Sequence, residues 1–152
     1  MGTMNNLGYV MVSAAAHDLA AIFDKRRLMP MFQLFLDSLT AVIWYANSRY
    51  FIKIQHRHRL TFNSILMFFW FLCMGCLIIH KFEIGFYLCL AWACSFGIVQ
   101  SFGESTTYGL LKGYPSKLVG AFAFGTGVAG ILGAGILLVL NRYMNSGYTF
   151  LI

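Results

Sequence analysis

Residues 60–80 read LTFNSILMFFWFLCMGCLIIH, which is an almost unbroken apolar run. A helix needs roughly 20 predominantly apolar residues to cross the hydrocarbon core of a bilayer. The run has this length, and a polar turn follows it at His80. This stretch therefore predicts a transmembrane helix and puts the chain in the class of helical membrane proteins.

Apolar segments separated by short polar turns continue on both sides of this run. We predict five helices in one transmembrane domain, over residues 7–23, 28–46, 60–80, 84–111 and 118–140. Pro30 falls in the first turn of the second helix, where its missing N–H group does no harm. The first helix has only about 17 residues, at or below the usual minimum for a span, and His17 and Asp18 interrupt it.

The composition agrees with an all-α membrane protein and argues against several other classes. Of the 152 residues, 59% are hydrophobic and 11% are charged, whereas a soluble domain has about 25% charged residues. The net charge of +6 lies in short loops, where basic residues meet lipid phosphates rather than nucleic acid. Because no nucleotide-binding loop, zinc-binding motif or hydrolase elbow occurs, we expect no enzyme and no cofactor. The cysteines lie in apolar runs and are interpreted as small apolar fillers: Cys73, Cys76, Cys89 and Cys94.

Two blocks of sequence resemble the battenin family of membrane proteins. The first block is NNLGYV at residues 5–10 followed by AAHD at residues 15–18, which resembles the family's first-helix pattern. The second block combines Gly-Glu-x-Thr at 103–106, Tyr-Pro at 114–115 and Gly-Thr-Gly-x-Ala-Gly at 125–130. The order and spacing of these elements are similar to those of family members.

The resemblance implies the first half of a major-facilitator-type fold, in which two helical halves enclose a site and rock against each other. It also implies a lysosomal or vacuolar membrane. The chain departs from the family pattern at residues 121–124, at Val128 and at Thr40, where the family has a proline three residues after its aspartate. Because the resemblance covers about half of the family's fold, we expect one wall of a transport site and no transport by this chain alone.

Asp37 lies near the middle of the second predicted helix, and Gln33 and Thr40 share its face. A carboxylate at this depth is costly in a membrane and by default indicates a proton or ion site. A structural hydrogen bond to a neighbouring helix explains Asp37 and Gln33 equally well. The sequence leaves both interpretations open.

Glu104 is a second candidate intramembrane acid and follows Gln100 by one turn. About 20 residues of its helix precede it, so a position at the membrane interface is favoured over a proton or ion role. His17 and Asp18 form a candidate titrating pair, since histidine changes charge near neutral pH. The favoured interpretation is that the first helix ends there and exposes both side chains to water.

Small residues recur every four positions in the fifth predicted helix, at Ala121, Gly125, Ala129 and Gly133. Gly130 lies on the adjoining row. This pattern allows two helix backbones to approach closely, which drives association where lipid offers no hydrophobic advantage. Helix packing is therefore the expected role of these five residues.

The connection between the second and third predicted helices is strongly basic, with Arg49, Lys53, Arg57 and Arg59. These side chains are candidates for binding an anionic lipid headgroup. The favoured interpretation is ordinary charge that sets the orientation of the helices. Six basic residues on this side against five on the other do not decide the orientation, although the positive-inside rule leans toward this side facing the cytosol or matrix.

Two functions fit these features. The favoured one is a non-catalytic accessory subunit of a larger membrane complex, such as a respiratory-type assembly of the inner mitochondrial membrane. The missing second half and the short first helix support it. The alternative is half of a lysosomal or vacuolar small-solute or proton-coupled transporter that pairs with a second half. Both predict membrane-protein partners and lipid surroundings, without nucleic acid.

Overall fold

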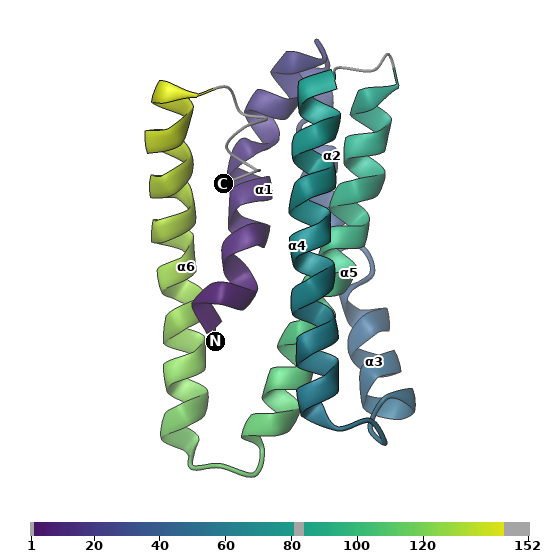
Figure 1. The fold of residues 1–152 in the computed structure, drawn as a ribbon, viewed down its shortest axis with the longest axis vertical. Helices are drawn as coiled ribbons and strands as arrows, with labels where there is room; N and C mark the ends of the chain where they lie inside the picture. The colour runs from purple at the N-terminus through teal and green to yellow at the C-terminus, as the bar shows by residue number, and fades with distance from the viewer. Residues whose placement is uncertain (1, 81–83, 145–152) are drawn as a thin grey trace.

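The computed structural model describes residues 2–80 and 84–144, and every regular element in these ranges is helical. The helices stand side by side in an upright bundle (Figure 1). They are α1 (Gly2–Ile22), the 3-10 helix η1 (Arg26–Leu28), α2 (Pro30–Asp37), α3 (Thr40–Tyr50), α4 (His56–His80), α5 (Gly85–Leu111) and α6 (Ser116–Tyr143). The predicted all-α fold is confirmed.

Four segments of the described chain are long and apolar enough to cross a membrane: Arg26–Tyr50, His56–His80, Gly85–Leu111 and Ser116–Tyr143. The 21 residues of α1 are not among them. An α-helix of this length is about 30 Å long, but α1 carries polar side chains such as Asn6, His17 and Asp18, which lower its hydropathy. The protein is an integral membrane protein, and α1 is the one long helix of the described chain that does not meet this criterion for a span.

The ends of the helices differ from the predicted ones. α1 begins at Gly2 rather than at residue 7, and α4 begins at His56 rather than at residue 60. α6 extends in both directions, to Ser116 and Tyr143. Backbone hydrogen bonding carries a helix beyond its apolar part, so hydropathy alone places the ends too far inward.

α5 is the central helix of the bundle. It contacts α1, α2, α3 and α4, whereas α6 packs mainly on α1 (Figure 1). In the most apolar window of each helix, 56% of the residues are buried in α5 but only 17% in α6. Gly97 permits this central position, because a Cβ atom there would overlap the backbone carbonyl of Leu36 in α2.

The predicted helix over residues 28–46 is divided into α2 and α3 by a break at Ser38 and Leu39. No proline causes this break. Ser38 Oγ donates to the carbonyl of Phe35 (3.1 Å), a contact that competes with the helical backbone. The same contact occurs at Ser105 inside the unbroken α5, so Ser38 alone does not cause the break.

Contacts with α5 hold both sides of the break. Before it, the Leu36 backbone rests against Gly97. After it, the hydroxyl oxygens of Thr40 and Ser101 lie 3.0 Å apart. Gly97 and Ser101 are one turn apart on the same face of α5, so a single stripe of small residues positions the broken helix.

The hydrophobic core lies nearer to the end where α1 turns into α2. Phe32 and Phe86 are fully buried there and meet edge to face, with ring centroids 5.7 Å apart. Leu19 of α1 and Cys89 of α5 are also fully buried in this core. This packing joins α1, α2 and α5 on one side of the break. On the other side, hydrogen bonds between polar side chains join α3 to α5.

One end of the bundle is strongly basic. The α3–α4 and α5–α6 connections lie at the same end, the lower one in Figure 1. Residues 49–59 and 112–117 contain no Asp or Glu, and their six basic side chains are Arg49, Lys53, Arg57, Arg59, Lys112 and Lys117.

Candidate intramembrane polar site

Four side chains of α1 and α2 form a connected group around the helix break, which we term the Asp37 cluster: Tyr9, Ser13, Gln33 and Asp37. Tyr9 donates its hydroxyl to Asp37 Oδ1 (2.9 Å), and Gln33 Nε2 donates to Asp37 Oδ2 (2.6 Å). Gln33 Nε2 also contacts the Tyr9 hydroxyl, and Ser13 Oγ donates to Gln33 Oε1 (2.8 Å). Both carboxylate oxygens of Asp37 thus have neutral hydrogen-bond donors.

The Asp37 cluster sits at mid-depth and on an open face. Asp37 is the last residue of α2 and lies near the midpoint of the spanning segment Arg26–Tyr50. The side chains of Asp37 and Gln33 are exposed on the surface of the bundle. A charged residue at the centre of a bilayer costs about 3 kcal/mol or more on insertion scales. This face is therefore expected to border water or another protein surface rather than acyl chains.

The chemistry of the break favours a proton or a cation. The last carbonyl groups of α2 have no helical partner, and a helix C-terminus carries partial negative charge. The Asp37 carboxylate adds a full charge at the same place. Within the described residues, no three His, Cys, Asp or Glu side chains come together as they would in a metal site. Asp37 is the carboxylate of the Asp37 cluster.

A second polar group links α1, α5 and α6 and includes the other predicted acid. Gln100 Nε2 donates to Asn6 Oδ1 (3.0 Å) and reaches Glu104 Oε2 (3.4 Å). Asn6 Nδ2 reaches the carbonyl of Thr126 on α6 (3.5 Å), and Asn5 Nδ2 reaches the carbonyl of Gln100 (3.4 Å). Glu104 is half-buried, and α5 continues for almost two turns beyond it.

The two groups are joined by one stripe of α1 that the sequence reasoning missed. Asn6, Tyr9, Ser13 and His17 follow each other at intervals of three or four residues, so they lie on one helix face. Asn6 bonds toward α5 and α6, whereas Tyr9 and Ser13 bond toward α2. The spacing can be seen in the sequence. Tyr9 and Ser13 do not stand out there, however, because this segment contains both polar and apolar residues.

His17 and Asp18 do not end the first helix as expected. α1 runs through both residues to Ile22 without a break. The His17 side chain is exposed, and its Nδ1 lies 3.5 Å from Asp18 Oδ1. Asp18 Oδ2 accepts a hydrogen bond from Asn141 Nδ2 of α6 (2.9 Å). Asp18 therefore joins α1 to α6 near the end of α1. The local sequence does not reveal this contact, because its partner lies on another helix.

The small residues of α6 differ in their surroundings. Gly125, Ala129 and Gly133 face α1: a Cβ atom at Gly125 would lie 3.2 Å from the backbone nitrogen of Thr3, and Ala129 is fully buried. A Cβ at Gly133 would lie 2.9 Å from a methyl group of Val10.

Two of the predicted packing residues of α6 lie elsewhere. Ala121 is exposed, and nothing lies within 4 Å of a Cβ built at Gly130. The buried row instead begins at Phe122, whose carbonyl lies against Gly2 at the start of α1.

The four basic residues proposed for lipid headgroups fall into two environments. Arg49, Lys53 and Arg57 are exposed at the basic end. Arg59 is only 6% exposed and lies beneath the α3–α4 connection. One position in a basic run is thus buried, which charge patterning alone does not indicate.

Arg59 belongs to a buried polar group that we term the Arg59 cluster: Asn47, His56, Arg59, Ser105 and Thr106. Arg59 Nη1 donates to Asn47 Oδ1 (3.0 Å), and Nη2 lies 2.9 Å from His56 Nδ1. Asn47 Nδ2 in turn donates to the hydroxyls of Ser105 (2.6 Å) and Thr106 (3.0 Å) on α5. The cluster joins α3, α4 and α5 without a carboxylate.

These features define an α-helical membrane protein with a broken second span and a carboxylate at mid-depth. A model of the family described as CLN3 protein matches residues 1–150. The chain is 27% identical over 135 residues to battenin of Dictyostelium discoideum, an alignment that covers 88% of this chain and 31% of that protein. The chain therefore belongs to the CLN3, or battenin, family. It spans about a third of the length of this relative. No solved structure matches the chain.

Proposed function

We propose that this chain forms one wall of a solute pathway in a battenin-type membrane carrier, and that the Asp37 cluster is its proton-binding or cation-binding element. The observation that carries the proposal is the Asp37 carboxylate itself. It lies near the midpoint of a membrane-spanning segment, at a helix break, with an exposed side chain. Discontinuous helices with exposed backbone groups are where secondary transporters bind substrates and coupling ions.

The arrangement of donors supports a reversible charge at Asp37. Tyr9 and Gln33 are neutral, so they stabilise the carboxylate without locking it in an ion pair. An ion pair with Lys or Arg would hold the charge too firmly for a group that must bind and release a proton or cation. Two neutral donors leave the site free to change its charge when the facing surface changes.

The carrier proposal is tested in vesicles from cells that lack the chain and are supplied with wild type or variants in the natural membrane. Small organic solutes retained by the vesicles are quantified by mass spectrometry with and without an imposed pH gradient. We expect gradient-dependent depletion of particular solutes with wild type and its loss with Asp37→Asn. Asp24→Asn, which changes an exposed acid in the α1–α2 turn, is the matched control and should retain the depletion.

A second function, that of a non-catalytic accessory subunit, is favoured by the same uncovered polar face. An assembly whose other chains cover Gln33 and Asp37 also removes the cost of exposing a carboxylate to lipid. In that case Asp37 would bind a partner chain and its charge would stay fixed. If the protein is a carrier, its family resemblance favours the lysosomal or vacuolar membrane. If it is an accessory subunit, the inner mitochondrial membrane is the proposed location.

Purification of the tagged chain in mild detergent separates the two functions. Native mass, identification of co-purifying proteins and organelle fractionation are measured together. A small particle from lysosomal or vacuolar membranes supports the carrier. A large stoichiometric complex that shrinks when this chain is deleted, with no solute dependent on Asp37, supports the accessory subunit and overturns the carrier.

A further inference from the structure

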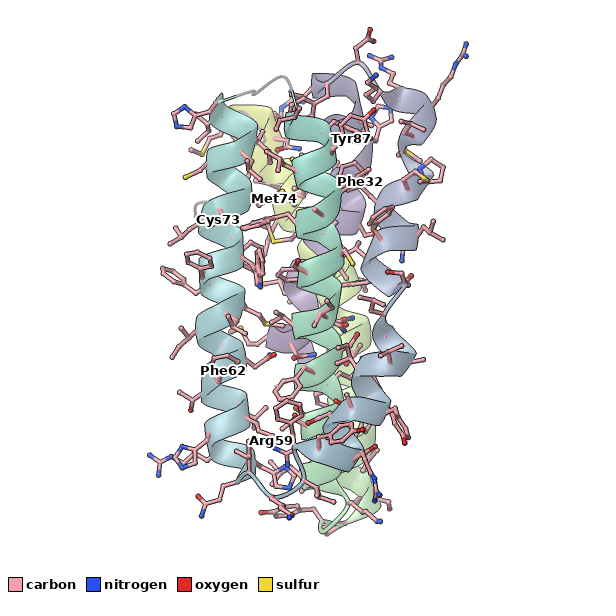
Figure 2. The ribbon with its side chains drawn as sticks, turned by 90° about the vertical axis from the view of Figure 1, so that its right-hand side faces the viewer. Phe32, Arg59, Phe62, Cys73, Met74 and Tyr87 are labelled. Carbon is pink, nitrogen blue, oxygen red and sulfur yellow. The ribbon has the colours of Figure 1, made fainter. Side chains whose placement is uncertain are left out.

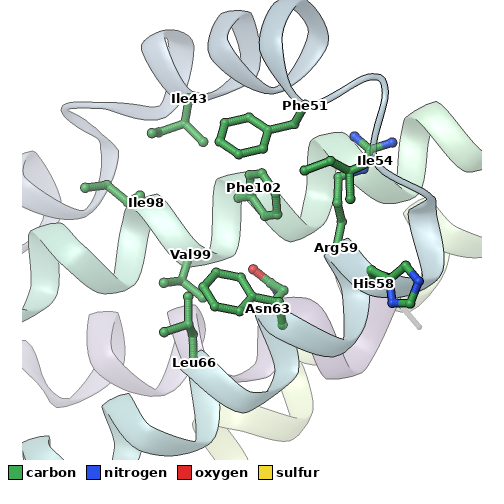
Figure 3. A pocket seen from close by; sticks show the side chains of 11 residues that line it. Ile43, Phe51, Ile54, His58, Arg59, Asn63, Leu66, Ile98, Val99 and Phe102 are labelled. Atoms are coloured by element: carbon green, nitrogen blue, oxygen red, sulfur yellow. The ribbon is translucent and has the colours of Figure 1, made fainter.

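A cavity of about 450 Å³ lies between α3, α4 and α5 near the basic end of the bundle (Figure 3). Eight of its eleven lining side chains are hydrophobic, including Ile43 of α3 and Val99 and Phe102 of α5. The volume falls within the range of roughly 300–1,000 Å³ that small-molecule sites occupy. The walls suit a hydrocarbon chain rather than a polar solute.

The cavity is open toward the surroundings of the bundle. Phe62 of α4 and Ile54 of the α3–α4 connection line it, and they are 58% and 44% exposed. Figure 2 shows Phe62 one turn from Arg59 along α4. A molecule lying in the membrane beside α4 therefore reaches the cavity sideways, without crossing the bundle.

Two polar side chains in the lining have unsatisfied atoms. Arg59 and Asn63 are 6% and 4% exposed and lie one turn apart on α4 (Figure 3). The Arg59 Nε–H donor and the Asn63 Oδ1 acceptor have no hydrogen-bond partner. Buried polar groups are almost always satisfied in folded proteins, and a ligand that supplies both an acceptor and a donor at this wall would satisfy these two atoms.

The charge of the missing partner is negative. Arg59 bonds to Asn47 and His56, neither of which carries negative charge. The segments at this end contribute six basic side chains and no acid, and Glu104 of α5 bonds to Gln100. A guanidinium taken out of water requires an anion or a dense set of hydrogen bonds.

We propose that the cavity binds one anionic phospholipid from the surrounding leaflet. Its phosphate pairs with Arg59 and with His58 at the mouth, and a headgroup hydroxyl donates to Asn63. Its acyl chain lies along Ile43, Val99 and Phe102. The lipid adds to the contacts through which Asn47 already joins α3 to α4 and α5 at this end, and it acts independently of the Asp37 cluster.

The full chain in nanodiscs tests this site directly. Nanodiscs of phosphatidylcholine receive a small fraction of phosphatidylglycerol that carries a photoactivatable group on its acyl chain, and adducts are mapped by peptide mass spectrometry. We expect adducts on the cavity residues of α3, α4 and α5. Competition with unlabelled phosphatidylglycerol should be roughly tenfold weaker for Arg59→Gln, the loss expected when a charge-assisted contact is removed.

Two variants keep the test decisive if Arg59→Gln folds poorly. Arg57→Gln removes the same charge from an exposed neighbour and should leave labelling and competition unchanged. Asn47→Asp supplies Arg59 with a carboxylate inside the protein, so it should fold and yet lose most of the labelling.

The remaining outcomes each overturn the proposal or narrow its source. Equal labelling by phosphatidylcholine would mean that only surrounding lipid was detected, and the site would be rejected. Thermal protection by inorganic phosphate alone, equal to that by phosphatidylglycerol, would reject the acyl-chain part. In the natural membrane rather than in nanodiscs, a cross-link from the Arg59→Lys variant to a carboxylate of another polypeptide would show that protein, and not lipid, neutralises this position.

Discussion

The Asp37 cluster and the Arg59 cluster each hold one charged side chain in the membrane-spanning part of the bundle, and each surrounds it with neutral partners. The Asp37 side chain is exposed, whereas Arg59 is 6% exposed. Asp37 lies at a break between two helices, while Arg59 is held between three. Accessibility, more than charge, thus distinguishes a site suited to exchange from a site suited to anchoring.

The largest effect on stability is expected from a substitution that disrupts the packing of α2 on α5 beside the Asp37 cluster. Gly97→Val would drive its side chain into the Leu36 carbonyl of α2. A small-to-large change against backbone has little room to relax, so the free energy of unfolding should fall by about 3 kcal/mol or more. Titration with a denaturing detergent, followed by tryptophan fluorescence, measures this fall.

The matched control for Gly97→Val is Gly127→Ala, because nothing lies within 4 Å of a Cβ at that glycine. Its free energy of unfolding should change by less than about 1 kcal/mol, with any gain coming from helix propensity. If Gly97→Val is as stable as wild type, α2 does not rest on α5, and the break beside Asp37 needs another cause.

The same amide-to-leucine change should separate the clusters. Asn47→Leu leaves the buried Arg59 guanidinium without its main acceptor, so the free energy of unfolding should fall by about 2 kcal/mol. Gln33→Leu acts on an exposed residue of the Asp37 cluster and should lower it by less than about 1 kcal/mol. Equal losses in detergent titration would remove the distinction between the two clusters.

Asp37→Asn should affect stability still less. The substitution keeps the shape and one acceptor for Tyr9 at an exposed position, so the free energy of unfolding should stay within about 0.5 kcal/mol of wild type. Thermal melting in detergent measures it. A large loss of stability would mean that the carboxylate serves the fold. A loss of transport in the Asp37→Asn variant would then say nothing about a transport role.

Tyr9→Phe is expected to have a small structural effect that is confined to the Asp37 cluster. It removes a single hydrogen bond to Asp37 at a partly exposed site, worth about 1 kcal/mol or less. Hydrogen exchange should rise in the last turn of α2 and stay unchanged in the Arg59 cluster. Faster exchange at both ends of the bundle would show that the clusters are coupled.

Much of the fold was predictable because hydropathy is a local property. The helices around residues 60–80, 84–111 and 118–140 follow from apolar runs of spanning length, and the family blocks gave the family. The break after Asp37 was not predictable, since it depends on Gly97 and Ser101, which lie about 60 residues further along the chain. Proline would have marked it, but the chain has Thr40 there.

The candidate sites were predictable in part. Asp37, Gln33, Gln100 and Glu104 stood out as polar side chains in apolar surroundings, but Tyr9 and Asn6, which bond to them, did not. Hydrogen-bond partners come from other helices, and no short-range pattern encodes which helix face meets which neighbour. For the same reason the row of small residues on α6 was predicted as a packing face, yet Ala121 lies outside the contact with α1.

The sequence by itself determined that this protein is helical, that it crosses a membrane and which family it belongs to, because apolar run length and ordered motifs are written along the chain. Only the tertiary structure decided that Arg59 is buried while Arg57, two positions earlier in the same basic run, is exposed. The physical reason is that burial depends on how α3, α4 and α5 pack together, and neighbouring residues on a helix point in different directions.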